Sequence, residues 1–206
     1  MNFNKKFYDE VVEVFNSECL SCIKKYEYDV DDIDADYLNQ KFNWFCEKYD
    51  CRFAAGVFRI SIIFNNEEYI IKYDKSLDKD SFELEEYYYT QAAEKGLEKF
   101  LVPIGTYYTD SGIEYGVQEK VIISSFDDLD GFSAETNRSY RRISSIVPIY
   151  KVFNFRDIFM LFIQYYGEDL AGEFCSFCYD CGINDIHGGN YGYLNGAPVI
   201  FDYAGC

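Results

Sequence analysis

The sequence predicts an α+β protein in which antiparallel strands lie between helical segments. Apolar residues recur every three or four positions in residues 1–50 and again from about residue 155 to 179, which is typical of helices with one buried face. Between these segments, residues 51–123 read as strand, strand, helix, strand, strand, with short polar turns inside both strand pairs. Strands joined by such turns pair in the antiparallel direction.

Residues 1–50 are expected to form a helical extension that precedes the strands. Two apolar sets at helical spacing indicate this: Phe7, Val11, Val14, Phe15 and Leu20, followed by Ile33, Tyr37, Leu38, Phe42 and Phe45. Asp31 or Asp32 is a plausible cap for the second helix. The stretch 27–36 between the two sets carries six acidic and no basic residues. It is either a solvated helix start or a negative patch that faces a basic partner.

The strands and the helix of the middle segment follow from local patterns. The runs VFRISIIF (57–64) and YIIKYD (69–74) flank Asn65-Asn66, which is a good hairpin signal. A helix capped by Ser81 and ended by Gly96 follows, and then strands over 100–109 and 113–123. The segment 124–156 is the least regular. The C-terminal part predicts a second hairpin, with YGYL and PVIFDY on either side of Asn195-Gly196.

The charge balance limits the partners that this protein can have. Acidic residues outnumber basic residues by 36 to 19, which gives a formal net charge of −17 at pH 7. A broad surface for nucleic acid needs clustered Lys and Arg, so none is expected. No apolar stretch reaches the ~20 residues of a membrane helix, and the N-terminus lacks the apolar run of a secretory signal. We therefore expect a cytoplasmic protein with mostly reduced cysteines.

Five of the nineteen basic residues lie in the segment 138–156: Arg138, Arg141, Arg142, Lys151 and Arg156. In an acidic chain this is a local reversal of charge that suits a phosphate, an acidic ligand or a protein partner. The alternative is that these residues only neutralise the protein's own acids. The sequence does not distinguish the two.

Cys175, Cys178 and Cys181 are spaced like the thiolates of an iron–sulfur site, and the Cys19-x-x-Cys22 pair resembles half of a zinc site. The residues around the first set, however, have the apolar periodicity of a helix. Thiols three apart on one helix lie along a face instead of surrounding an ion, and buried thiols are ordinary core material. We favour the core interpretation.

A candidate centre for phosphoryl transfer lies near the C-terminus. Asp185 is followed after five residues by Asn190, and Asp202 comes after the predicted hairpin. Carboxylate and amide oxygens on a rigid turn are suitable ligands for Mg²⁺, which shares its coordination sphere with substrate phosphates. Gly188-Gly189 allows the tight turn that would bring Asn190 back toward Asp185.

The hexapeptide DIHGGN, from Asp185 to Asn190, satisfies the pattern D-x-H-x-x-N. The chain here resembles the protein-kinase-like fold, in particular its aminoglycoside phosphotransferase and choline kinase branch, in which a metal-binding Asp follows a short hairpin. Asp202 stands at that position. The resemblance implies that Asp185 accepts or orients the proton of the attacking hydroxyl, that Asn190 and Asp202 bind Mg²⁺, and that His187 mainly orders the loop.

The order of the upstream elements also fits this resemblance. Lys72, in the strand YIIKYD, takes the position of the lysine that binds the ATP phosphates. The helix after it supplies Glu85 as the partner glutamate, with Glu86 and Glu83 as alternatives. The order of these strands, helices and motifs along the chain is a more specific sign of the resemblance than any one motif.

The resemblance further implies a two-lobe organisation. It places an antiparallel N-lobe at 51–121 and a minimal helical C-lobe at 122–206, after the helical extension 1–50. Gln118 and Glu119 would form the hinge at which adenine binds. Gly56 is the only glycine in AAGVFRIS, where the family has a glycine-rich loop over the phosphates, so the backbone cradle is expected to be weaker.

Three functions are consistent with this sequence. The first is an ATP- and Mg²⁺-dependent phosphotransferase acting on a protein or small-molecule acceptor, favoured because Lys72, Asp185, Asn190 and Asp202 occur together. The second is a kinase-like regulator or inhibitor, such as a phage could encode, that binds a partner protein. It is favoured because the sequence ends four residues after Asp202, where relatives continue into substrate-binding helices. The third and weakest is an acidic mimic of nucleic acid.

Overall fold

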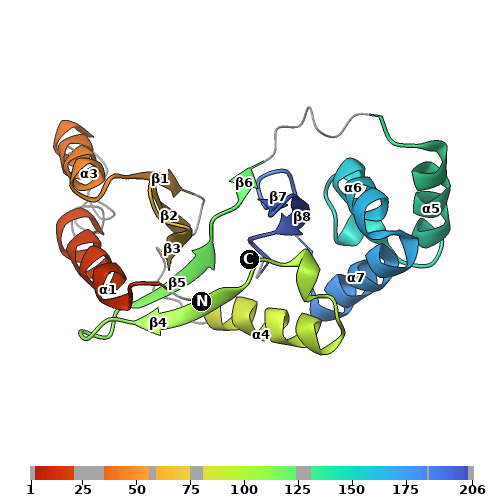
Figure 1. Cartoon of the computed structure of the whole chain (residues 1–206), viewed down its shortest axis with the longest axis horizontal. Coiled ribbons are helices and arrows are strands. Elements are labelled where there is room, and N and C mark those ends of the chain that lie inside the picture. Colours follow the sequence, from red (N-terminus) through yellow and green to blue (C-terminus); the bar gives the residue numbers. More distant parts are fainter. Residues whose placement is uncertain are drawn as a thin grey trace. The chain divides into compact units, whose positions relative to one another are not determined.

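The computed structural model describes residues 3–20, 35–55, 59–74, 81–123, 131–184 and 186–203 (Figure 1). It shows a mixture of helices and antiparallel sheets, which confirms the predicted α+β class. The chain divides into two compact units, which are described separately below. The first comprises Met1–Asp80 and Gly105–Lys120, and the second comprises Ser81–Ile104 and Val121–Cys206.

The first unit contains a five-stranded sheet with the strand order β1-β2-β3-β5-β4. Its strands are β1 (Cys51–Ala55), β2 (Arg59–Phe64), β3 (Tyr69–Asp74), β4 (Ile104–Tyr108) and β5 (Glu114–Glu119). The predicted hairpin over 65–68 joins β2 to β3, and the side chains of Asn65 and Asn66 each donate a hydrogen bond of 2.6 Å to the carboxylate of Asp50. The sequence patterns did not predict β1, which pairs with β2 along its whole length.

The N-terminal helices share one hydrophobic core with this sheet. They are α1 (Lys5–Val14), the π-helix η1 (Phe15–Leu20) and α3 (Ala35–Tyr49). Asn4 caps α1 by accepting a hydrogen bond from the Phe7 N–H at 3.2 Å. The Phe15 ring lies 5.5 Å from that of Phe45 in α3 and 5.6 Å from that of Tyr73 in β3. The predicted cap at Asp31 or Asp32 lies outside the described residues.

The second unit is mainly helical and includes a small three-stranded sheet with the order β6-β7-β8. Its elements are α4 (Ser81–Glu94), η3 (Glu98–Phe100), β6 (Ile122–Ile123), α5 (Ala134–Ser144), η5 (Ile149–Lys151), α6 (Arg156–Tyr166), α7 (Glu168–Cys181), β7 (Tyr191–Leu194) and β8 (Ala197–Ile200). Its core includes Phe100, whose ring stacks on Phe174 of α7 with the centroids 4.3 Å apart.

Four sequence predictions for residues 100–179 need correction. The strand predicted over 100–109 begins only at Ile104, after the turn of η3. The strand predicted over 113–123 ends at Glu119, and residues 122–123 pair instead with β7. The single helix predicted over about 155–179 is two helices, because Gly167 has φ +87° and ψ 164° and interrupts the right-handed helix. The irregular segment 124–156 contains α5, which Ser133 caps by accepting a bond from Thr136 N–H.

The predicted C-terminal hairpin is confirmed. Asn195 and Gly196 join β7 to β8 with φ values of +53° and +82°, which Asn and Gly adopt more readily than other residues. Among the described residues, no helix is long and apolar enough to span a bilayer.

Candidate functional site

The β7–β8 hairpin brings two of the predicted metal ligands to the same end. Tyr191 pairs with Ile200 at the open end of the hairpin, so Asn190 lies just before it and Phe201 just after it. The Phe201 N–H donates a 2.9 Å hydrogen bond to the Asn190 carbonyl. Asp202 is the next residue and is half-buried. The turn residues at 195–196 therefore position Asn190 close in space to Asp202.

A tight turn orders the loop before Asn190. The Nδ1 atom of His187 accepts a 2.9 Å hydrogen bond from the Gly189 N–H, and the Asn190 N–H donates to the His187 carbonyl at 3.0 Å. A Cβ atom on Gly189 would lie 2.9 Å from the His187 ring, so a larger residue here would displace the ring or the turn. Since Nδ1 acts as the acceptor, a neutral His187 carries its proton on Nε2. His187 thus performs a loop-ordering role.

Asp185, the predicted proton acceptor, lies outside the described residues, but its described neighbour Ile186 is firmly held. Ile186 is fully buried, its N–H donates to the Val152 carbonyl at 3.1 Å, and its own carbonyl accepts from the Asn154 N–H at 2.9 Å. The loop that leads to Asn190 is therefore anchored to the segment between η5 and α6.

The structure distinguishes among the three candidate glutamates of α4. Glu83 and Glu86 are exposed, whereas Glu85 is fully buried. Glu85 Oε1 accepts a 3.2 Å hydrogen bond from the Tyr203 N–H, immediately after Asp202. The Tyr203 hydroxyl in turn donates to the Val102 carbonyl at 2.9 Å. Backbone hydrogen bonds therefore hold the chain on both sides of Asp202.

Lys72 lies in β3, an inner strand of the first unit's sheet, opposite Ser61 on one side and Gly116 on the other. It is only 3% exposed, so it is not a solvated edge residue. A lysine is rarely buried to this extent unless its charge is compensated. In β5, Gln118 is fully buried and Glu119 is half-buried.

The predicted residues are distributed over both units. Lys72, Gln118 and Glu119 belong to the first unit, and Glu85, Asn190 and Asp202 belong to the second. Gly56 lies outside the described residues. Within the second unit, hydrogen bonds connect Asn190 and Glu85 to the residues on either side of Asp202.

The side chains of Asn190 and Asp202 have the chemistry that Mg²⁺ requires. One amide oxygen and one carboxylate are sufficient protein ligands for this ion, which keeps several waters and binds substrate phosphates. Among the described residues, no three His, Cys, Asp or Glu side chains are grouped so that they could share a metal ion.

The basic segment 138–156 is partly neutralised within the protein. Arg142 forms a two-pronged ion pair with Glu168, through Nε to Oε1 at 2.6 Å and through Nη2 to Oε2. Hydrogen bonds from Arg142 and Ser139 lower the pKa of Glu168 to about 2. Arg156 donates to the Asn137 side chain at 2.5 Å and lies over the Tyr140 ring. For Arg142, the structure supports the interpretation that it neutralises the protein's own acid.

The cysteines at 175, 178 and 181 lie along helix α7, as the core interpretation proposes. Cys175 and Cys178 are fully buried in the hydrophobic core of the second unit. Burial raises the pKa of Cys175 to about 12 and raises that of Cys178 well above its ordinary value. A metal ligand must be a thiolate, so this environment disfavours a cluster.

Two positioning residues were missed by the sequence patterns. Gly192 in β7 lies so close to β6 that a Cβ atom there would be 2.7 Å from the Ile122 carbonyl oxygen. The sequence pattern that could have identified Gly192 is a glycine inside a predicted strand, because such a glycine often marks the close approach of another backbone. Tyr203 had no comparable signal, because its role depends on α4 and on Val102, both about a hundred residues away in the sequence.

Comparison of the chain with protein-family models, with curated proteins and with solved structures finds no match.

Proposed function

We propose that this chain is a protein-kinase-like phosphotransferase that uses ATP and Mg²⁺. The observation that carries the proposal is the way in which the backbone around Asp202 is held. Asn190 accepts from Phe201 on one side, and the buried Glu85 accepts from Tyr203 on the other. Glu85 lies 117 residues before Asp202 in the sequence. Nevertheless, Asn190 and Glu85 accept hydrogen bonds from the two residues that flank Asp202.

In this proposal, each residue has a role that follows from its chemistry. The Asn190 amide oxygen and the Asp202 carboxylate hold Mg²⁺, which when bound neutralises charge on the phosphate oxygens. The Lys72 ammonium binds the phosphates, and Gln118 and Glu119 contribute to the adenine site. Asp185 accepts or orients the proton of the acceptor hydroxyl. His187 and Gly189 keep Asn190 in position without taking part in the chemistry.

Thermal unfolding with and without nucleotide tests this proposal. A site saturated at 100 times its dissociation constant stabilises by about 2.7 kcal/mol, which corresponds to a rise in Tm of roughly 5–10 °C for a chain of this size. We expect this rise with ATP and Mg²⁺ and its loss with EDTA. Asp202→Asn and Lys72→Ala should also lose it, whereas Glu83→Gln, an exposed position on the same helix as Glu85, should retain it.

An assay for transfer of label from ATP distinguishes catalysis from nucleotide binding. Incubation with ATP labelled at the γ- or at the α-phosphate, with the chain itself and hydroxyl-bearing small molecules as acceptors, shows whether a phosphoryl or a nucleotidyl group moves. Transfer of label by the wild type that is lost in Asp202→Asn would support a phosphotransferase. A Mg²⁺-dependent shift in Tm with no transfer would favour a nucleotide-binding regulator, and a wild type without any such shift would rule out both.

A further inference from the structure

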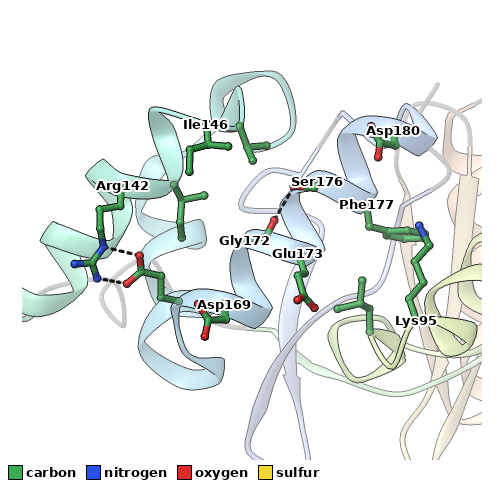
Figure 2. A pocket seen from close by; sticks show the side chains of 13 residues that line it. Lys95, Arg142, Ile146, Asp169, Gly172, Glu173, Ser176, Phe177 and Asp180 are labelled. Atoms are coloured by element: carbon green, nitrogen blue, oxygen red, sulfur yellow. Dashed lines mark hydrogen bonds and ion pairs between the residues drawn. The ribbon is translucent and has the colours of Figure 1, made fainter.

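The second unit contains a pocket of about 490 Å³ that the proposed phosphotransferase site does not use. It lies between α5 and α7 and next to the segment that follows α4 (Figure 2). Leu97, Ile143 and Phe177 provide an apolar floor and are each at most 6% exposed. A volume of this size is typical of pockets that accept a ligand or a few side chains.

The rim of this pocket combines one exposed apolar side chain with a row of acids. Ile146 is 83% exposed, the highest value among the large hydrophobic residues that the structure describes. Asp169, Glu173 and Asp180 follow one another along α7 at spacings of four and seven, so they share a helix face (Figure 2). In the described part of the chain, none of these three carboxylates forms an ion pair.

The basic groups at the pocket are already engaged. Arg142 is paired with Glu168, as described above, and the Lys95 ammonium lies over the Phe177 ring, 5.4 Å from its centroid. Lys95 and Arg142 offset only part of the charge of the four acids that line the pocket, Glu168, Asp169, Glu173 and Asp180, so the lining keeps a net negative charge. A ligand that fits this rim is basic.

Gly172 of α7 leaves space at the floor of the pocket. A Cβ atom at this position would find its nearest neighbour, in the Ile143 side chain, at 3.7 Å, which is ordinary contact. Packing therefore does not require a glycine here, although glycine inside a helix is less stable than alanine. The glycine leaves the backbone of α7 bare at the floor, where a ligand can approach closely.

We propose that this pocket binds a basic segment of a partner protein. An apolar side chain of the segment occupies the floor beside Ile146 and Gly172, and flanking Lys or Arg side chains pair with Asp169, Glu173 and Asp180. A second copy of this chain does not suit the site, because two chains with a net charge of −17 each repel one another. The proposal is independent of ATP and of the residues around Asp202.

Selection from a displayed library of random 12-residue peptides, with the full-length chain as bait, tests this proposal. Enriched peptides should share an apolar residue flanked by Lys or Arg, and their affinity should fall as salt is raised. A library with no enrichment over blank support, or with enriched peptides that lack basic residues, would overturn the proposal.

Variants then locate the binding site, with one enriched peptide, labelled with fluorescein, as the probe in anisotropy titrations. The double variant Asp169→Asn, Glu173→Gln keeps the side-chain shapes and should weaken binding roughly 2- to 30-fold, as expected for two exposed ion pairs. Gly172→Leu, which fills the floor, should weaken it by more than about tenfold. Asp157→Asn, an exposed acid of α6 outside the pocket, is the control. Wild-type affinity in the double variant would contradict the proposal even if Gly172→Leu fails to fold.

Discussion

The Tyr203 N–H donates a hydrogen bond of 3.2 Å to Glu85 Oε1, and so joins helix α4 to the residue that follows the proposed metal ligand Asp202. Both groups are buried, so loss of the acceptor would leave a backbone donor without a replacement from water. We expect Glu85→Ala to lower the free energy of unfolding by about 1–3 kcal/mol. Urea denaturation measures this value. Glu86→Ala, an exposed neighbour on the same helix, should stay within about 0.5 kcal/mol of wild type; equal losses in the two variants would contradict this role of Glu85.

Two glycines should respond to alanine in opposite directions. At Gly192, the added Cβ atom would lie 2.7 Å from the Ile122 carbonyl oxygen, so β6 and β7 must separate. We expect a loss of about 1–3 kcal/mol in the free energy of unfolding. At Gly172, the nearest atom is 3.7 Å away, and Gly172→Ala should raise stability by up to about 1 kcal/mol. Denaturant midpoints of the two variants check both signs, and a destabilised Gly172→Ala would show that the pocket floor has less room than its geometry indicates.

The ion pair of Arg142 and Glu168 should make stability depend on pH in the acid range. The pKa of Glu168 is lowered from its ordinary 4.5 to about 2 by hydrogen bonds from Arg142 and Ser139. Because the pKa of Glu168 is lower in the folded than in the unfolded protein, its ionised form stabilises the fold at pH values above 4.5. This contribution to the free energy of unfolding is lost as the pH falls from 4.5 toward 2. The gap in stability between wild type and Arg142→Met should therefore be largest near neutral pH and narrow at pH 3. Urea titrations at both pH values test this, and a gap that widens on acidification would refute it.

The two buried thiols of α7, Cys175 and Cys178, should be unreactive in the folded protein. Cys175 and Cys178 are buried with raised pKa values, whereas Cys46 and Cys181 are half-buried and accessible in part. Of these four thiols, we expect a thiol reagent at pH 8 to modify Cys46 and Cys181 first, and Cys175 and Cys178 only on unfolding. Peptide mapping after timed labelling measures the order. Fast labelling of Cys178 in the native protein, or release of iron or zinc on unfolding, would reverse the core interpretation.

Much of the local structure could be predicted because it depends on neighbouring residues. The hairpin at Asn195-Gly196 needs two residues that tolerate positive φ, and the sequence supplies them in adjacent positions. The β2–β3 hairpin and helix α4 follow from apolar periodicity and polar turns in the same way. These elements set the order of the candidate site residues along the chain, and the β7–β8 hairpin alone brings Asn190 opposite Phe201.

The sequence by itself thus determined the α+β class, the β2–β3 hairpin, helix α4 and the β7–β8 hairpin that places Asn190 opposite the residue before Asp202. Only the tertiary structure decided which glutamate of α4 is buried, and that Arg142 is neutralised by Glu168. It also decided that residues 122–123 leave the first sheet and pair with β7. The physical reason is that backbone conformation responds to adjacent residues, whereas burial and pairing depend on partners that the fold brings from distant positions, as Tyr203 is brought to Glu85.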